Sequence, residues 1–230
     1  MTALVDEIRG ARPDLDVRLC FLDLNAPSVE RTIDAVAAEG SSGAVLVPLL
    51  LGSAFHARID LPTIVARARS QRPGLALTQA NVLGADARLP AVLRDRVIEA
   101  GFETHDGTVG VVTAAVGSSN ARANHRSRRF MAAVAAGTDW ITQACFATTD
   151  PRVDEAVRAL YERGASCVVI APWFLAPGVL TDRIGAAAQV AAPKSTCVNV
   201  LGAHPMVARV VLDRYDEAIQ RLHVRSESIA

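Results

Sequence analysis

The chain has 230 residues, half of them hydrophobic, and its formal net charge is zero. A neutral chain without a basic face gives no electrostatic reason to expect a nucleic-acid partner. No apolar run approaches the roughly 20 residues that a membrane-spanning helix needs. Residues 1–7 lack the basic and then apolar pattern of a secretion signal. The sequence therefore predicts a cytoplasmic protein with neither a nucleic-acid nor a membrane partner.

Short β-branched runs alternate with longer Ala-, Leu- and Arg-rich segments of helical period, which is typical of parallel βαβ units. Strands are predicted at residues 17–22, 44–50, 75–83, 109–115, 140–146, 167–171 and 196–201. Helices are predicted at residues 2–12, 28–39, 61–71, 87–100, 121–136, 152–163, 181–191 and 206–222. Several strands are apolar almost throughout, as expected when helices cover both faces of a sheet. The sequence thus predicts an α/β fold of mostly parallel sheets flanked by helices.

The two halves of the sequence repeat each other. Eight residues between Pro27 and Leu51 recur between Pro151 and Leu175 at a constant offset of 124 residues. The pentapeptide Asn-Val-Leu-Gly-Ala at 81–85 recurs letter for letter at 199–203, at an offset of 118 residues. The period is too long for a solenoid. We therefore expect a duplicated Rossmann-like unit, with domains at residues 1–104 and 105–230.

The first half lacks the element with which the second half begins. The second half starts with the strand 109–115 and the turn Val116-Gly-Ser-Ser119, whose counterpart would precede Met1. A sheet without a buried parallel strand exposes its apolar neighbours. We therefore expect the first unit to be truncated at its start, by a misplaced start codon or a shortened gene.

Candidate chemistry lies where strands end, because open parallel sheets bind ligands at the carboxyl ends of their strands. The segment 48–56 follows one strand and ends in His56, which could bind a divalent metal or accept a proton near neutral pH; a capping or packed loop histidine is the alternative. Gly117 and Ser118 open a helix that could hold a carboxylate or phosphate, and a helix cap explains them equally well. The absence of GxGxxG, P-loop, GxSxG and HExxH motifs argues against nucleotide, serine-hydrolase and zinc-protease functions.

The other chemically capable residues are interpreted as structural. His204 stands where the first half has Asp86, and we expect it to cap the last helix. His125 lies in the Arg-rich segment 122–129, which we interpret as a solvated helix face. The four cysteines form no CxxC pair, and each lies in or beside an apolar run, which favours buried reduced thiols.

The segment Pro48 to Pro62, Pro-Leu-Leu-Leu-Gly-x-x-x-His-x-x-x-Asp-Leu-Pro, resembles the class II tetrapyrrole chelatases, the CbiX-type sirohydrochlorin cobaltochelatases and ferrochelatases. Residues 21–29 and 201–205 are also similar to that family, and the resemblance covers nearly the whole chain. It implies a lyase that inserts Co²⁺ or Fe²⁺ into sirohydrochlorin or a related tetrapyrrole, in cobalamin or siroheme biosynthesis. The divalent metal is then a substrate, and no organic cofactor is expected.

The resemblance also implies a site. The metal-free tetrapyrrole would lie in the cleft between the halves, with His56 as metal ligand and proton acceptor. Asp60 could orient or assist His56, and a helix-capping or solvated carboxylate is the alternative. The substrate's carboxylates would be held by the Gly/Ser loops at Gly52, Ser53, Gly117 and Ser118. The family's other active-site histidine lies in a His-Gly-Ser turn after the first strand, which is absent from the first half and reads Val116-Gly-Ser in the second.

Three hypotheses follow from these observations. The first is the chelatase. The second is a degenerate homologue that binds a tetrapyrrole or a metal without turnover. The third is an α/β protein for an unrelated small ligand. The sequence leaves the choice of metal and the oligomeric state open.

Overall fold

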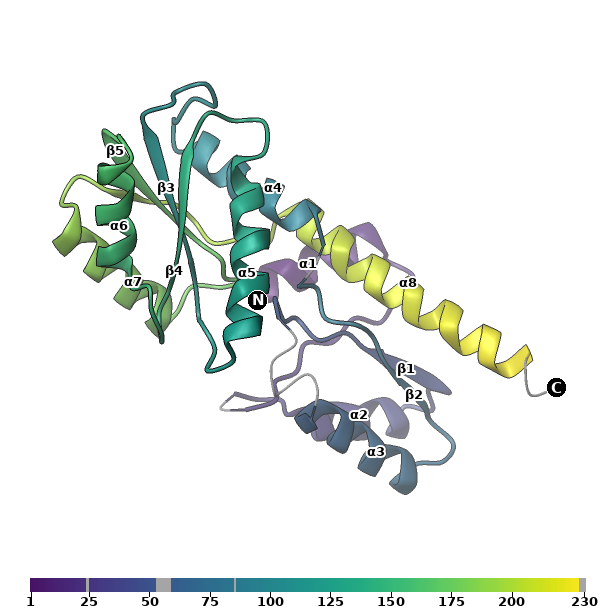
Figure 1. Ribbon diagram of the computed structural model, residues 1–230. Coiled ribbons are helices and arrows are strands. Elements are labelled where there is room, and N and C mark those ends of the chain that lie inside the picture. Colours follow the sequence, from purple (N-terminus) through teal and green to yellow (C-terminus); the bar gives the residue numbers. More distant parts are fainter. Residues whose placement is uncertain (24, 53–58, 85, 228–230) are drawn as a thin grey trace. The chain divides into compact units, whose positions relative to one another are not determined.

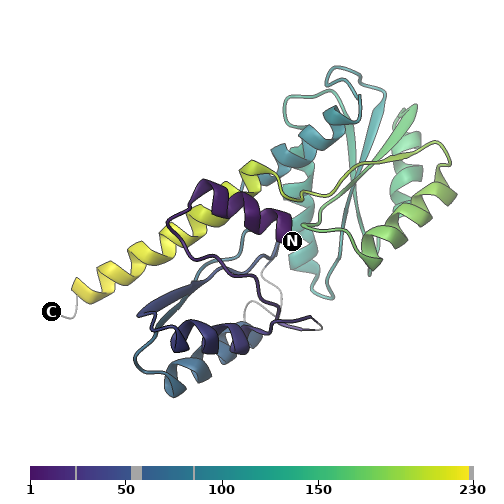
Figure 2. The same ribbon diagram turned by 180° about the vertical axis from the view of Figure 1, so that it is seen from behind.

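The computed structural model describes residues 1–23, 25–52, 59–84 and 86–227 (Figures 1 and 2). It forms two compact units. The four-stranded unit comprises residues 86–207 together with Met1, and the two-stranded unit comprises Thr2–Ala85 and Ala208–Ala230. None of the helices in the described part of the chain is both long and apolar enough to cross a membrane.

The four-stranded unit contains a parallel sheet with the strand order β4-β3-β5-β6. Its strands are β3 (Val109–Ala115), β4 (Ile141–Phe146), β5 (Cys167–Pro172) and β6 (Thr196–Cys197). β3 pairs with β4 from Gly110↔Ile141 and with β5 from Val109↔Cys167. All seven residues of β3 are buried, as its apolar sequence predicts for a central strand.

Helices cover both faces of this sheet (Figure 1). They are α4 (Arg88–Glu99), α5 (Ala121–Ala132), α6 (Val153–Glu162) and α7 (Val179–Ala191), with the short 3₁₀ helix η2 (Ala133–Ala135) after α5. α6 and α7 pack on one face, where Leu160 and Ile184 join Val112 and Ile170 of the sheet in one apolar core. α4 and α5 lie on the opposite face. For α5 this follows from right-handed crossovers, because the chain crosses the sheet in one direction from β3 to β4 and in the other direction from β4 to β5.

The two-stranded unit pairs β1 (Gly43–Leu46) with β2 (Ala76–Gln79) in parallel, from Gly43↔Ala76 to Leu46↔Gln79. Its helices are α1 (Thr2–Ala11), α2 (Val29–Ala38), α3 (Leu61–Gln71) and, from Ala208 onward, α8 (Pro205–Glu227). Val29 and Ile33 of α2, Leu61 and Val65 of α3 and Leu77 of β2 form its core. The α/β class and the parallel pairing predicted from the sequence are confirmed.

The strand predicted over residues 17–22 is wrong, and the repeat explains why. At an offset of 124 residues, α2 coincides with α6, and residues 17–22 coincide with β4. β4 pairs with β3, but within the described residues nothing occupies the corresponding place between residues 17–22 and β1. Residues 17–22 therefore form only an isolated bridge, from Phe21 to Ser28.

The same missing neighbour changes the burial of β1. Val169 of β5 lies between two partner strands and is completely buried, whereas Val45, its counterpart in β1, is half-buried. Val45 is thus more exposed than its counterpart, as the sequence predicts for a sheet that lacks its first strand.

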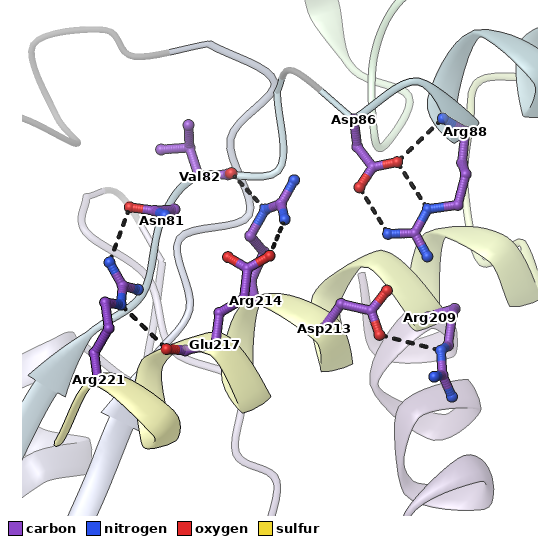
Figure 3. Close-up of polar contacts among 9 residues, drawn as sticks. All are labelled: Asn81, Val82, Asp86, Arg88, Arg209, Asp213, Arg214, Glu217 and Arg221. Atoms are coloured by element: carbon purple, nitrogen blue, oxygen red, sulfur yellow. Dashed lines mark hydrogen bonds and ion pairs between the residues drawn. The ribbon is translucent and has the colours of Figure 1, made fainter. Parts of the chain in front are cut away.

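The compact units are divided differently from the sequence repeats. The proposed domains, residues 1–104 and 105–230, follow the repeat, but α4 of the first repeat belongs to the four-stranded unit. Most of α8, from the second repeat, belongs to the two-stranded unit. Side-chain contacts fix α8 there: Arg214 Nε donates to the Val82 carbonyl (3.2 Å), and Arg221 Nη1 donates to Asn81 Oδ1 (3.5 Å) (Figure 3).

Candidate functional site

The carboxyl edge of the two-stranded sheet is built from two chain segments that continue side by side after β1 and β2. The Ala80 N–H donates to the Leu46 carbonyl (2.9 Å). The N–H groups of Leu83 and Gly84 both donate to the Leu50 carbonyl, at 3.0 and 3.2 Å. These bonds hold the segment that leads to Gly52, a predicted substrate-binding residue, against residues 80–84.

Gly84 is essential to this packing, and the sequence analysis did not single it out. A Cβ atom on Gly84 would lie 2.3 Å from the Leu51 carbonyl oxygen and 2.9 Å from the Gly52 nitrogen. Backbone atoms cannot yield at such distances without moving the segment, so only glycine permits this close approach. The repeated pentapeptide was the available signal, because a glycine kept in both copies suggests a shared structural need.

The four-stranded unit contains the same arrangement. The Leu201 N–H donates to the Phe174 carbonyl (2.9 Å). This bond is the counterpart of the bond from Leu83 to Leu50, because Leu201 matches Leu83 at the offset of 118 residues and Phe174 matches Leu50 at the offset of 124 residues. The pentapeptide therefore recurs because, in each unit, it fixes the segment that follows a strand at the carboxyl edge.

Helix caps follow the pentapeptide in both copies. The Arg88 N–H donates to Asp86 Oδ1 (3.1 Å), and the Met206 N–H donates to His204 Nδ1 (3.1 Å). Asp86 also receives hydrogen bonds from the Arg88 guanidinium at 2.7 Å (Figure 3). The predicted capping role of His204 is confirmed.

His56 and Ser53, the predicted metal ligand and one of the predicted substrate contacts, lie outside the described residues. Gly52 is described and exposed, and Asp60 is the residue immediately before α3. Within the described part of the chain, no three His, Cys, Asp or Glu side chains gather closely enough to hold a metal ion.

The turn after β3 brings Gly117 and Ser118 together at the carboxyl edge of the four-stranded sheet. Gly117 has φ +89°, in the left-handed region that favours glycine, and a Cβ there would lie 2.9 Å from Phe146 Cβ. The Ser118 N–H donates to Asn124 Oδ1 (2.9 Å), and Asn124 Nδ2 donates to the Ser118 carbonyl (2.7 Å). Asn124 is 9% exposed, so it locks the turn onto α5 from inside.

The start of α5 is capped by its own sequence. Asn120 Oδ1 accepts hydrogen bonds from the N–H groups of Arg122 (3.0 Å) and Ala123 (3.3 Å), and Ser118 Oγ accepts from the Asn120 N–H (3.1 Å). These contacts satisfy several of the amides that a bound anion would otherwise use. The helix-cap interpretation of the Gly-Ser turn therefore accounts for most of its polar groups. Sequence reasoning missed Asn124, which bonds to both the N–H and the carbonyl of Ser118.

The four cysteine side chains differ in their burial. All four are unpaired; Cys145 is buried, Cys20 and Cys167 are half-buried, and Cys197 is exposed, unlike the prediction. Burial raises the pKa of Cys145 to about 12, with the Asp154 charge acting in the same direction. A thiol that stays protonated at neutral pH is a poor metal ligand.

Two repeated parallel α/β units, each with a glycine-containing turn or segment at the carboxyl edge, define a duplicated open-sheet fold. Proteins of this class usually bind their ligands at the carboxyl ends of the strands. The family model CbiX matches residues 1–100 and 110–218. The chain belongs to the CbiX family.

Named relatives extend this assignment. A sirohydrochlorin cobaltochelatase of Priestia megaterium is 27% identical over 215 residues, covering 89% of this chain and 70% of the relative. A sirohydrochlorin ferrochelatase of the same organism is 25% identical over 213 residues, covering 89% and 79%. The structure of SirB from Bacillus subtilis with Fe³⁺ has the same fold, with a TM-score of 0.76, 23% identity, and coverage of 94% of this chain and 88% of the other.

Proposed function

We propose that this protein is a metal chelatase that inserts Co²⁺ or Fe²⁺ into sirohydrochlorin. The observation that carries the proposal is the family match over residues 1–100 and 110–218, which includes the segment of His56 and the turn of Gly117 and Ser118. The named cobaltochelatase and ferrochelatase relatives, each matched over 89% of this chain, support the same reaction and both metals.

In this proposal His56 binds the incoming metal and accepts a proton. A neutral imidazole holds Co²⁺ or Fe²⁺ and can also act as a base near neutral pH. Two pyrrole N–H groups must each release a proton as the divalent metal enters the macrocycle. The imidazole nitrogen from which the metal has departed accepts one of these protons, and water accepts the other. Asp60, four residues after His56, assists that histidine.

Gly52, Ser53, Gly117 and Ser118 contact the carboxylate-bearing rim of the substrate. Small residues let the backbone approach a flat ligand closely, and serine hydroxyls can donate to carboxylate oxygens. The contacts of Gly84 with Gly52 and of Asn124 with Ser118 support this role, because they fix both places before substrate arrives.

The test follows the absorbance of sirohydrochlorin mixed anaerobically with Co²⁺, and separately with Fe²⁺, for wild type, His56→Ala and His105→Ala. His105 is the matched control, because it is an exposed histidine whose ring faces Asp139 (3.3 Å) on the surface of the four-stranded unit. We expect wild type and His105→Ala to accelerate metallation, and His56→Ala to lose most of that acceleration.

Metallation no faster than in the protein-free mixture would reject the chelatase. A shifted but static tetrapyrrole spectrum would then identify a binding homologue without turnover. The metal that reacts faster assigns the pathway, since cobalt insertion serves cobalamin synthesis and iron insertion serves siroheme synthesis.

A further inference from the structure

Helix α5 presents a stripe of arginines to solvent. Arg122, Arg126 and Arg129 are exposed and lie at positions i, i+4 and i+7, so they share one side of the helix. Asn124 and Met131 are the buried residues of α5 and point to the opposite side. We name Arg122, Arg126 and Arg129 the α5 stripe.

The α5 stripe has no counter-charge in the described part of the chain. Many other arginines of the chain form ion pairs: Arg12 lies 2.8 Å from Asp14, and Arg18 lies 2.6 Å from Asp16. The three arginines of the stripe form no ion pair with any described residue, and α5 contains no Asp or Glu. In a chain of zero formal net charge, this surplus is a local concentration of positive charge.

This arrangement works against the stability of the helix. Like charges three and four residues apart repel each other, and a cation in the first turn opposes the helix dipole. Arg128, the neighbouring arginine, behaves differently: its guanidinium lies 5.3 Å from the centre of the Phe146 ring and donates to the Asp150 carbonyl (3.4 Å). The three arginines of the stripe lack such contacts among the described residues, and a bound anion would reduce the repulsion among them.

The α5 stripe begins beside a predicted substrate-binding turn, and this position indicates which anion it binds. α5 begins directly after the turn of Gly117 and Ser118, at the carboxyl edge of the central strand β3. From Arg122 to Arg129 the helix rises about 10 Å, which is comparable to the width of a tetrapyrrole. Sirohydrochlorin carries several carboxylates at its rim, and a guanidinium binds a carboxylate through two parallel hydrogen bonds.

We propose that the α5 stripe binds the peripheral carboxylates of the tetrapyrrole substrate and guides it to the carboxyl edge of the four-stranded sheet. This inference rests on the proposed chelatase function and extends it to a residue set that neither the family match nor the sequence motifs single out. The stripe supplies binding and attraction, and it takes no part in the transfer of protons or metal.

The test compares wild type with the triple variant Arg122→Gln, Arg126→Gln, Arg129→Gln. The matched control is Arg158→Gln, Arg183→Gln, which removes two exposed arginines from α6 and α7 on the other face of the sheet. Binding of metal-free sirohydrochlorin and the kinetics of metallation are measured at low and at high NaCl concentration. A third variant replaces all three stripe residues with lysine and keeps the charge.

We expect the Gln triple variant to bind sirohydrochlorin about tenfold more weakly at low salt, since each exposed ion pair contributes about a factor of two. KM should rise by a similar factor with kcat unchanged, because only binding is lost. Salt should weaken wild type more than the variant. The Lys variant should recover most of the binding, and the α6/α7 control should match wild type.

An unchanged KM and unchanged sirohydrochlorin affinity in the Gln triple variant, with wild type active, would overturn this inference while leaving the chelatase intact. If wild type metallates nothing, the proposed function fails, and the direct binding comparison still decides whether the stripe holds the tetrapyrrole. Salt-sensitive binding of a duplex DNA oligonucleotide that the triple substitution abolishes, with sirohydrochlorin affinity unaffected, would assign the stripe to nucleic acid and reject the proposal.

Discussion

The close packing of Gly84 against the segment of Leu51 and Gly52 makes Gly84→Ala the most informative substitution. The new Cβ would lie 2.3 Å from the Leu51 carbonyl oxygen, and an ordinary contact begins at 3.4 Å, so the segment must retreat by about 1 Å. That movement stretches the hydrogen bonds from Leu83 and Gly84 to Leu50, now 3.0 and 3.2 Å, beyond bonding distance. Two lost hydrogen bonds of about 1 kcal/mol each and the overpacking strain lower the free energy of unfolding by about 3 kcal/mol.

Urea denaturation followed by circular dichroism measures this loss, with Gly185→Ala as the control. Gly185 lies inside α7, and nothing lies within 4 Å of the position that an alanine Cβ would take, so alanine there should stabilise the helix by about 0.5–1 kcal/mol. Gly84→Ala should also slow metallation, because it displaces Gly52. If Gly84→Ala proved as stable as wild type, the account of this edge as a fixed, close-packed platform would be refuted.

Three further outcomes are expected. Asn124→Ala should cost about 2 kcal/mol in urea denaturation, because the N–H and carbonyl of Ser118 lose their partners at 2.9 and 2.7 Å. Because the pKa of Cys145 is raised to about 12, the unfolded chain loses the thiol proton at a lower pH than the folded chain does. The free energy of unfolding should therefore fall by about 1.4 kcal/mol per pH unit between pH 9 and 12. Melting measured as a function of pH should show this slope for wild type and lack it for Cys145→Ala. Arg214→Gln should lower the free energy of unfolding by about 1 kcal/mol, because the bond from Arg214 to the Val82 carbonyl is lost. Arg209→Gln on the same helix is the control: its side chain is 68% exposed, and the free energy of unfolding should change by less than about 0.5 kcal/mol.

Local patterns and the internal repeat predicted most of the fold. α2 and α6 have the same bounds once the offset of 124 residues is applied, and the buried central strand β3 was recognisable from its unbroken apolar run. Residues 17–22 show the limit of such reasoning. Their sequence suits a strand, but a strand also needs hydrogen-bonding neighbours, and the place beside them that β3 fills in the other unit has no described occupant.

The candidate site could be predicted only in part. The Gly117 and Ser118 turn and the His204 cap were recognisable because short motifs fix their local geometry. Asn124 and Gly84 act through contacts with residues six or more than thirty positions away, which no local pattern reveals. The functional roles of all the predicted site residues stay predictions: His56, Gly52, Ser53, Asp60, Gly117 and Ser118.

The interleaving of the two compact units has a consequence for how the chain folds as it is synthesised. Residues 86–207 form one continuous stretch, so the four-stranded unit can assemble as soon as that stretch has left the ribosome. The two-stranded unit must wait, because its earlier part, residues 2–85, is completed by α8 from Ala208 onward. Residues 2–85 are translated before residues 86–207 and yet acquire their final packing after them.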